Sequence, residues 1–238
     1  MHPLFLRAYR LLKPVLGHPF RVVAHSLRRR LTGDTSQLGE ASVAYSLAED
    51  AWPRWVVEVG ANDGITGSNA RLFLRKGWNA LLVEPNPNLF PRLVKNVAAW
   101  PAARCESVAC SDAPGVLPLR IFADDPTGML STIHSDAETN RGRTRPVAEV
   151  HDVEVVTLTS LLDRHEVPRD FGVLSVDAEG HDLNVLRGLD FERYRPHLII
   201  TESDERTEEE EAKRALLHQH GYTLIERVGV NTIWQHTA

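Results

Sequence analysis

The chain has 238 residues, of which 42% are hydrophobic and 25% are charged, and its formal net charge at pH 7 is −5. This apolar content excludes a low-complexity disordered chain, and the sequence pI near 6.1 excludes a strongly basic nucleic-acid binder. Every uncharged run is well short of the roughly 18 residues that a membrane-spanning helix needs. The two cysteines, Cys105 and Cys110, indicate no disulfide framework, so we expect a globular protein of the cytoplasm.

The charge is unevenly distributed along the chain. Asp34 is the first acidic residue, and seven basic residues precede it among apolar ones: Arg7, Arg10, Lys13, Arg21, Arg28, Arg29 and Arg30. An amphipathic basic segment can lie on an anionic membrane surface, or it can form a helical arm that packs on the domain or on a second subunit of a homodimer. Both interpretations stay open, and we expect residues 1–50 to form a basic N-terminal helical arm.

From Trp52 onward, short apolar runs alternate with amphipathic stretches. The apolar runs predict strands at 55–59, 79–84 and 103–110, and the stretches between them predict helices at 68–76 and 87–97. Strands that alternate with helices of this length indicate βαβ units, and therefore a parallel sheet covered on both faces.

The stretch 115–156 breaks this alternation. Strands are predicted at 117–122 and 154–156, and the polar segment 124–149 between them is rich in turn residues. A connection this long in a compact domain is usually a lid, a binding loop or disordered. We expect it to be an insertion that supplies the acceptor pocket, with 127–132 as a flexible lid and Arg141, Arg143 and Arg145 available to an anionic acceptor.

The alternation then resumes to the end of the chain. Helices are predicted at 181–189 and 208–220, and strands at 172–177, 197–202, 222–226 and 231–235. The short turn between the last two strands predicts an antiparallel hairpin at the edge of the sheet. We therefore predict one α/β domain over residues 51–238, with a mostly parallel Rossmann-like sheet, an antiparallel C-terminal hairpin and helices on both faces.

Two features predict a nucleotide-type ligand site at the carboxyl ends of the first two strands. Glu58 to Gly64 (EVGANDG) ends one strand and opens a glycine-containing turn, and Glu84 ends the next strand. Glycines let the backbone approach a ligand closely, and an acidic side chain at the second strand end can accept hydrogen bonds from both ribose hydroxyls. The spacing matches neither a dinucleotide fingerprint nor a phosphate-binding loop. Glu58 and Asp63 would repel a pyrophosphate but would suit the cationic sulfonium of S-adenosylmethionine.

Several separated segments carry a more specific pattern. They are 58–69 (EVGANDGITGSN), 82–87 (LVEPNP), 174–182 (LSVDAEGHD) with 185–188 (VLRG), and 196–202 (PHLIITE). In this order they resemble the motifs of the FkbM-type S-adenosylmethionine-dependent methyltransferases, a family of the class I methyltransferase fold. The resemblance runs from about Trp52 to the C-terminus. It implies a seven-stranded sheet with a reversed final hairpin, S-adenosylmethionine as methyl donor, and transfer to a hydroxyl oxygen.

The resemblance also implies roles for individual residues. The methionine part of the donor would be surrounded by Glu58, Gly60, Asn62 and Asp63, with Ser68 and Asn69 closing over it. Glu84 would hold the ribose, and Ser107 and Val108 would flank the adenine.

Methylation of an alcohol requires removal of the hydroxyl proton, so a general base or a metal must assist. Asp177 and Glu202 end two strands that are neighbours in this fold, and with Asp204 they could hold one Mg²⁺ through oxygen ligands. In the alternative without a metal, Asp177 and Glu179 orient the donor and the loop. His181, at the start of a helix, is the candidate base because an unperturbed histidine pKa near 6.5 suits proton removal at neutral pH. His134, in the long polar segment, is the rival.

The leading hypothesis is an O-methyltransferase acting on a sugar or glycoside hydroxyl, a small molecule or a glycan and not a nucleic acid. A second hypothesis is methylation of a polyketide or lipid-linked acceptor, for which the basic arm would place a cytoplasmic enzyme at the membrane surface. The third is a donor-binding protein without catalytic activity. The ionisable side chains of Asp177, Glu179, His181 and Glu202 argue against the third, because a binding shell alone would not need them.

Overall fold

The computed structural model describes residues 32–125, 127–133, 145–203 and 207–237. Most of the predicted basic arm (residues 1–31), His134, Arg141, Arg143 and Asp204 lie outside the described residues. Within the described parts of the chain, no helix has both the length and the apolar character needed to cross a bilayer.

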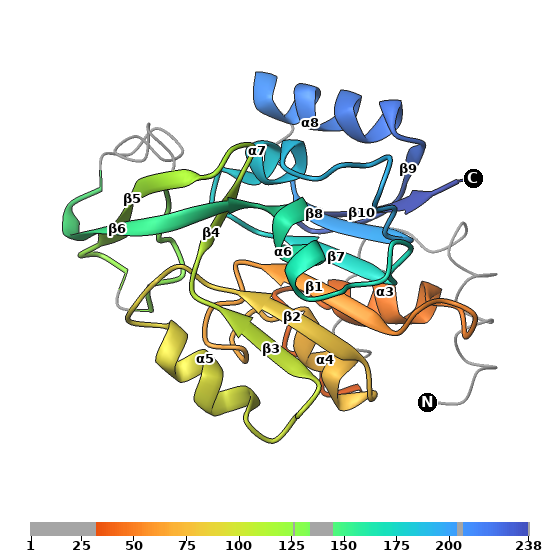
Figure 1. The fold of residues 1–238 in the computed structure, drawn as a ribbon, viewed down its shortest axis with the longest axis horizontal. Helices are drawn as coiled ribbons and strands as arrows, with labels where there is room; N and C mark the ends of the chain where they lie inside the picture. The colour runs from red at the N-terminus through yellow and green to blue at the C-terminus, as the bar shows by residue number, and fades with distance from the viewer. Residues whose placement is uncertain (1–31, 126, 134–144, 204–206, 238) are drawn as a thin grey trace.

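The centre of the molecule is a seven-stranded sheet in the order β3-β2-β1-β7-β8-β10-β9 (Figure 1). Five strands run parallel: β1 (Trp55–Val59), β2 (Asn79–Val83), β3 (Ala103–Glu106), β7 (Val173–Val176) and β8 (Leu198–Glu202). The last two, β9 (Tyr222–Val228) and β10 (Asn231–His236), form a hairpin whose inner strand β10 pairs antiparallel with β8. The predicted Rossmann-like sheet with a reversed C-terminal hairpin is therefore confirmed.

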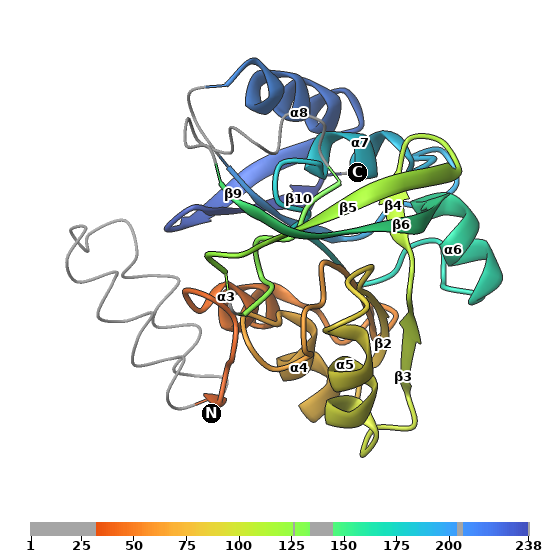
Figure 2. The ribbon, with the colours of Figure 1, turned by 90° about the vertical axis from the view of Figure 1, so that its left-hand side faces the viewer.

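Helices cover both faces of the sheet, as Figure 2 shows. One face packs against α3 (Glu40–Leu47), α4 (Ala70–Arg75) and α5 (Phe90–Val97), and the other against α6 (Leu158–Arg164), α7 (Asp182–Arg187) and α8 (Glu208–Gln219). Side chains along a strand alternate between the two apolar clusters, so Val56 faces the first helix layer and Val57 the second. Burial on both faces explains why the central strands are continuous apolar runs.

The helix α3 lies within the stretch predicted as an N-terminal arm. Its Ala41, Val43 and Ala44 are buried in the same apolar cluster as Val56 and Phe73 of the methyltransferase-like region. The part of the predicted arm that contains α3 is thus packed against the sheet.

A second, three-stranded sheet corrects the predicted third strand. The run 103–110 is two strands in two sheets: β3 ends at Glu106, and β4 (Ala109–Ser111) joins β5 (Gly115–Phe122) and β6 (Val147–Thr157) in the order β4-β6-β5. β6 begins well before the predicted 154–156. The prediction missed its first part because residues 147–152 are mostly exposed and their apolar and polar side chains do not alternate regularly. Part of the predicted substrate loop is therefore a regular hairpin with its own small apolar cluster.

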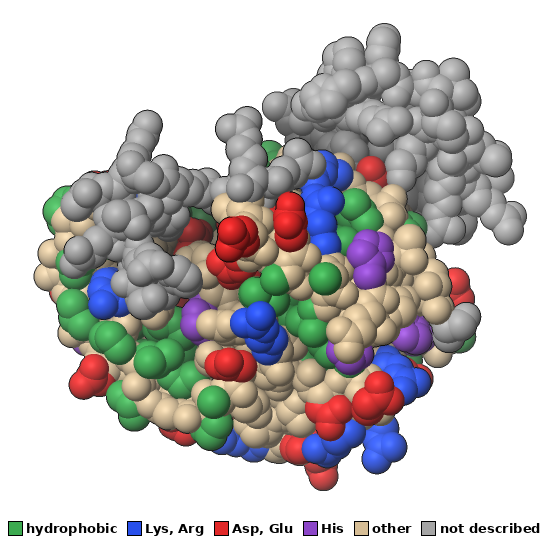
Figure 3. All heavy atoms as spheres, turned by 90° about the horizontal axis from the view of Figure 1, so that it is seen from above, with side chains coloured by type: hydrophobic (Ala, Val, Ile, Leu, Met, Phe, Trp, Pro, Cys, Tyr) green, Lys and Arg blue, Asp and Glu red, His purple; other side chains and the backbone are tan. Residues whose placement is uncertain are grey.

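Seen from the side of α8, the surface has acidic and basic side chains interspersed with apolar ones and not gathered by sign (Figure 3). This face is therefore typical of a solvated surface.

The contact between α7 and the small sheet gives a test of the packing between the two sheets. Gly188 follows α7, and a Cβ there would lie 2.1 Å from the carbonyl oxygen of Ser111 in β4. We expect Gly188→Ala to lower the free energy of unfolding by about 1–3 kcal/mol, as overpacking does elsewhere. Urea unfolding followed by circular dichroism measures this. Gly115→Ala is the matched control, since a Cβ at Gly115 meets nothing within 4 Å; equal effects of the two variants would contradict the packing.

Candidate functional site

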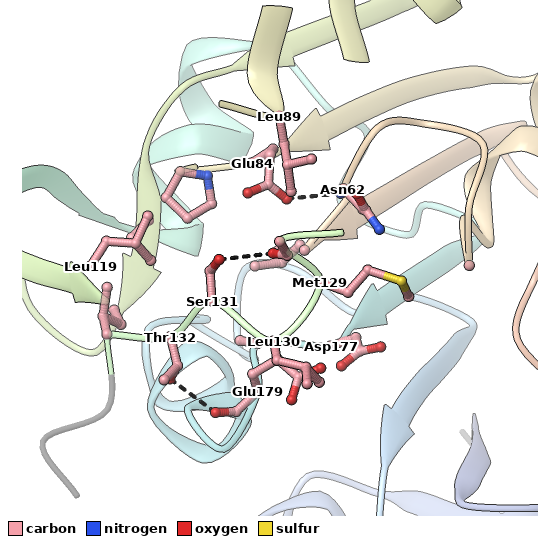
Figure 4. Close-up of a pocket in the computed structure, with 18 of the residues that line it drawn as sticks. Asn62, Glu84, Leu89, Leu119, Met129, Leu130, Ser131, Thr132, Asp177 and Glu179 are labelled. Carbon is pink, nitrogen blue, oxygen red and sulfur yellow. Dashed lines mark hydrogen bonds between the residues drawn. The ribbon is translucent and has the colours of Figure 1, made fainter. Parts of the chain in front are cut away.

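A cavity of about 890 Å³, counted out to its open mouth, lies at the carboxyl ends of β1, β2 and β7. The carboxyl edge of a parallel sheet is the usual place for a ligand in such folds. The segment between β5 and β6 covers the cavity from the side of the small sheet (Figure 4). Its lining contains Gln37, Gly60, Asn62, Thr66, Gly67, Glu84, Leu89, Val108, Cys110, Leu119, Asp177, Glu179 and residues 128–133.

The turn after β1 brings two strand ends into contact. Gly60 has a φ of +84°, and a Cβ at this position would lie 1.9 Å from the carbonyl oxygen of Asp177, so only glycine fits. Asn62, two residues on, has a φ of +50°, an unusual conformation for a residue with a side chain. Its backbone N–H donates to Glu84 at 2.8 Å. The turn therefore ties the ends of β1, β2 and β7 together at the cavity.

Glu84 follows β2 on the cavity wall and is only 6% exposed. Its two carboxylate oxygens each accept one backbone hydrogen bond of 2.8 Å, from Asn62 and Asn86. Burial raises the pKa of Glu84 to about 7, against 4.5 for an ordinary glutamate. A carboxylate has about four acceptor positions, so each oxygen can accept one further hydrogen bond. Glu84 could thus hold a pair of neighbouring hydroxyls.

Beside Glu84 the wall is apolar. Leu89, Val108, Cys110 and Leu119 line this part of the cavity: Leu89 precedes α5, Val108 lies between β3 and β4, and the other two belong to the small sheet. Burial raises the pKa of the Cys110 thiol to about 12, so the thiol stays neutral. Ser107, the other predicted adenine contact, is not among the lining residues. An apolar wall beside a carboxylate that accepts hydrogen bonds from hydroxyls suits a flat aromatic base and its sugar.

Two carboxyl groups after β7 face the cavity. Asp177 donates its backbone N–H to Val59 in β1, and its side chain lies on the cavity wall together with that of Glu179. Burial and the negative charges of Glu179, Asp182 and Glu202 raise the pKa of Asp177 well above its usual value. Glu179 has a φ of +48°, so its backbone is in the strained left-handed region. Such strain is often found where a side chain must be aimed at a ligand.

Asp182 holds the loop that carries these two groups. Its oxygens accept from the backbone N–H of Ala178 at 2.7 Å and from the hydroxyl of Thr201 at 3.0 Å. The ammonium of Lys213 lies 3.9 Å away, and both side chains are nearly buried. The loop after β7 is therefore fixed from the inside of the protein.

His181 is placed away from the cavity. Its ring is buried, Nε2 lies 2.9 Å from the hydroxyl oxygen of Ser111 in β4, and the residue is not among those that line the cavity. The imidazole thus lies at the junction of α7 and the small sheet, and its role as the base stays a prediction.

The segment predicted as a lid lies over the cavity. Ser131 accepts a hydrogen bond of 2.9 Å from the side-chain amide of Asn86, and the hydroxyl of Thr132 donates to the carbonyl oxygen of Glu179 at 2.9 Å. Asp125 accepts from the backbone N–H of Leu130 at 2.7 Å. The contacts of Ser131 and Thr132 connect the segment to the ends of both β2 and β7; Figure 4 shows the one between Thr132 and Glu179.

Glu58, Ser68 and Asn69, predicted to surround the donor, do not line the cavity. The buried carboxylate of Glu58 accepts from the Ser68 hydroxyl at 2.8 Å and from the backbone N–H of Asn69 at 2.5 Å. The side-chain amide of Asn69 donates to the Ser175 hydroxyl at 3.0 Å. These hydrogen bonds hold the end of the loop 60–69 against β1 and β7, and so they fix the place where the loop borders the cavity.

Asp63 also acts within the loop. Its carboxylate accepts from the backbone N–H groups of Ile65 and Thr66 at 2.9 and 2.7 Å, and it lies 3.3 Å from the guanidinium of Arg92. It too is absent from the cavity lining.

The predicted magnesium ligands are only partly described. Asp177 lies on the cavity wall, whereas Glu202, at the end of β8, does not, and Asp204 lies outside the described residues. Among the side chains that the structure describes, no group of three or more His, Cys, Asp or Glu is arranged to hold a metal.

Gln37 and residues 128–133 are lining residues that the sequence analysis did not assign to a ligand by motif. Gln37 precedes the predicted domain and belongs to no motif. Residues 128–133 lie in an insertion whose path over the cavity depends on β5 and β6 pairing, which the sequence did not reveal.

The strand order and the cavity define a Rossmann-like α/β domain with a ligand site at the carboxyl edge of its sheet. The sequence matches the methyltransferase FkbM domain over residues 58–224, and the chain belongs to this family of S-adenosylmethionine-dependent methyltransferases.

Relatives of known name fit this assignment. Over 167 residues the chain is 30% identical to the hexuronic acid methyltransferase AglP of Haloferax volcanii; the match covers 69% of this chain and 62% of that protein. Solved structures that resemble it include a methyltransferase FkbM from Methylobacillus flagellatus (TM-score 0.45, 10% identity, 76% of this chain and 43% of that one). Another is the precorrin-6y C5,15-methyltransferase of Geobacter metallireducens (TM-score 0.47, 12% identity, 85% and 89%). Both TM-scores are below 0.5, so the family assignment rests on the sequence match.

The buried Glu58 predicts a dependence of stability on pH. Burial raises its pKa from 4.5 to about 7, so between these pH values the unfolded chain has released a proton that the folded chain keeps. Rising pH therefore favours unfolding, and the contribution of Glu58 falls by about 3 kcal/mol across this window. Between pH 4.5 and 7, we therefore expect the free energy of unfolding of the wild type to fall by about 3 kcal/mol relative to that of Glu58→Gln.

Urea unfolding at several pH values measures this difference. Glu154→Gln, on an exposed residue of β6, is the control and should follow the wild-type curve. Parallel curves for wild type and Glu58→Gln would show that the Glu58 carboxyl is not perturbed as described.

Proposed function

We propose that the protein is an O-methyltransferase that transfers a methyl group from S-adenosylmethionine to a hydroxyl of a sugar or glycoside. The observation that carries this proposal is the pair of carboxyl groups, Asp177 and Glu179, on the wall of the cavity. In the same cavity, Glu84 could accept hydrogen bonds from two neighbouring hydroxyls. The name of the relative AglP, a hexuronic acid methyltransferase, supports a carbohydrate acceptor.

The residues of the cavity fit the parts of the proposed donor. Glu84 would accept hydrogen bonds from the ribose hydroxyls, and Leu89 and Val108 would contact the adenine. Gly60 and Asn62 would lie along the methionine part. Glu58, Asp63, Ser68 and Asn69 lie off the cavity and would act through the shape of the loop that carries Gly60 and Asn62. When bound, the donor supplies a methyl group on a positively charged sulfur.

Asp177 is the proposed general base. A positive charge in the cavity favours the ionised form of this carboxyl group, whose pKa is raised by burial and by its acidic neighbours. A base with a raised pKa accepts a proton more strongly once it is ionised. The acceptor oxygen would bond to the methyl carbon as the bond between that carbon and the donor sulfur breaks, and its proton would pass to an oxygen of Asp177. The sulfur would keep the electron pair of the broken bond and leave as the neutral thioether of S-adenosylhomocysteine. Glu179 would act by keeping the pKa of Asp177 high.

This proton transfer uses neither His181 nor a magnesium ion. Magnesium bound by Asp177, Glu202 and Asp204 stays a prediction, as do a homodimer and contact of the basic arm with a membrane.

Donor binding tests the role of Glu84. The hydroxyls of a ribose need the ionised carboxylate, so donor affinity should fall as pH drops below about 7, the pKa of Glu84. We expect Glu84→Gln to weaken binding of S-adenosylmethionine by roughly tenfold or more and to reduce this pH dependence to the part that Asp177 contributes. Titration calorimetry from pH 6 to 8.5 measures both. Glu154→Gln is the control, because Glu154 is exposed on β6 and lies off the cavity, and it should leave the affinity within about threefold.

Transfer kinetics test the base. With S-adenosylmethionine at a concentration that saturates each variant and a pool of methyl hexosides as acceptors, we expect Asp177→Asn to lower kcat by about 10²–10⁴. Glu179→Gln removes a negative charge beside Asp177, lowers the pKa of Asp177, and should shift the acidic limb of the rate profile to lower pH. An unchanged kcat in Asp177→Asn, with a large loss in His181→Ala, would instead identify the histidine as the base.

A further inference from the structure

The segment 128–133 is joined to Glu84 through Asn86. Asn86 is completely buried, and its backbone N–H donates to the carboxylate of Glu84 at 2.8 Å. Its side-chain amide donates to the hydroxyl oxygen of Ser131 at 2.9 Å, and its side-chain oxygen accepts from the backbone N–H of Asn88, also at 2.9 Å. One buried residue therefore orients the carboxylate of Glu84 and holds the middle of the segment.

The same segment is joined to the loop after β7 through Thr132. The side-chain hydroxyl of Thr132 donates to the carbonyl oxygen of Glu179 at 2.9 Å (Figure 4). Thr132 is buried, and its backbone pairs with that of Arg120 in β5, N–H to carbonyl in both directions, at 2.9 and 3.1 Å. The hydroxyl therefore acts on Glu179 from a position that the small sheet fixes.

The loop after β7 has a backbone conformation that needs support. Glu179 and Gly180 both have positive φ angles, +48° and +89°, and this conformation is strained for a residue with a side chain. Asp182 holds the loop on the interior side by accepting from the backbone N–H of Ala178. Thr132 binds it on the cavity side, at the carbonyl group of the strained residue itself. Without the Thr132 hydroxyl, the loop would lose one of the contacts that stabilise it.

These contacts complete a closed path around the cavity. One half of the path is the turn after β1, which joins Glu84 to the backbone of Asp177. The other half is the segment 128–133, which joins the Glu84 side to Glu179. The position of the proposed base relative to the proposed ribose contact is thus set from two sides. Catalytic groups depend on such support, because small displacements from the reactive geometry lower the rate.

We infer that Thr132 is a positioning residue for Asp177 and Glu179, and that the segment 128–133 sets the place of their loop relative to Glu84. The inference rests on the proposed roles of Asp177 and Glu84, and it assigns a task to an insertion. A loosened loop would leave the Glu84 contact with the donor in place. It would hold the Asp177 carboxylate in the reactive geometry for a smaller fraction of the time, so kcat would fall more than donor affinity.

Hydrogen exchange of the donor-free protein tests the hold of Thr132 on the loop. The backbone N–H groups of Ala178 and His181 are hydrogen-bonded within the loop, so their exchange, followed by NMR, reports its opening. Thr132→Val keeps the shape of the side chain and removes its hydroxyl. We expect it to accelerate both exchange rates by about threefold to tenfold, the usual effect of one hydrogen bond. Thr132→Ser keeps a hydroxyl and should restore the wild-type rates.

Thr237→Val is the control for this experiment. The hydroxyl of Thr237 also donates to a carbonyl oxygen, that of Gly221 at 3.0 Å, and it lies off the cavity. This variant should leave the exchange of Ala178 and His181 at the wild-type rates. Unchanged exchange in Thr132→Val, or an equal acceleration in Thr237→Val, would overturn the inference.

Transfer kinetics test the consequence for catalysis. With S-adenosylmethionine and a pool of methyl hexosides at concentrations that saturate each variant, we expect Thr132→Val to lower kcat by about threefold to tenfold. Its Kd for the donor, measured by calorimetry, should stay within about twofold of the wild type, and Thr132→Ser should restore kcat. A loss of donor affinity as large as the loss of kcat, or no recovery in Thr132→Ser, would overturn the inference. If the wild type binds the donor but methylates no hexoside, sugar methylation is overturned, and the exchange rates alone decide whether Thr132 holds the loop.

Discussion

The close approach of the ends of β1 and β7 is the constraint on which the site depends. A glycine at position 60 lets the backbone pass against the carbonyl group of Asp177, and any side chain there would occupy the same space. This contact places Asn62 where its N–H can orient Glu84, and it places Asp177 on the opposite wall. This one backbone contact therefore fixes the position of Glu84, which would bind the ribose hydroxyls, relative to Asp177, the proposed base.

The carboxyl groups around this contact are held at an energetic cost. Burial raises the pKa values of Glu58 and Glu84 to about 7 and that of Asp182 to about 6, so each opposes folding as the pH rises through its window. Glu58 and Asp182 use their charge to fix the loops after β1 and β7. Glu84 and Asp177 face the cavity, where a cationic donor with hydroxyl groups would stabilise the ionised forms. Ionisation of Glu84 and Asp177 is unfavourable in the ligand-free protein and becomes favourable when a cation binds, so these groups increase the affinity for a cationic donor.

Much of the central sheet and part of the cavity could be predicted from the sequence. The apolar runs and the motifs at Gly60, Glu84 and Asp177 located the central sheet and three residues of the cavity, because strand periodicity and turn glycines are local signals. The split between β3 and β4 could not be found, since Ala103–Glu106 and Ala109–Ser111 read as one run and belong to separate sheets only through their partners. The same holds for β6, whose exposed first half lacks an apolar pattern.

The side chains show the same limit. Glu58 and Asp63 are acidic residues of a ligand-binding motif, yet their hydrogen bonds go to the loop, and His181 follows the β7 motif but faces Ser111. Gln37 reaches the cavity through contacts with Glu40 and Asn231, the second of which is 194 residues away. The direction of a side chain and long-range docking of this kind depend on tertiary structure and leave no local sequence signal.

Proton release on donor binding tests the central claim most directly. The claim is that buried carboxyl groups with raised pKa values form the wall of a site for a cationic donor. Calorimetric titration of the protein with S-adenosylmethionine at pH 7, in buffers of different ionisation enthalpy, measures both the affinity and the protons exchanged. We predict micromolar binding with release of protons to the buffer, because the bound cation and its hydroxyls favour the ionised carboxylates. Binding without proton release would contradict the electrostatic account, and no binding would contradict the assignment of this cavity to the donor.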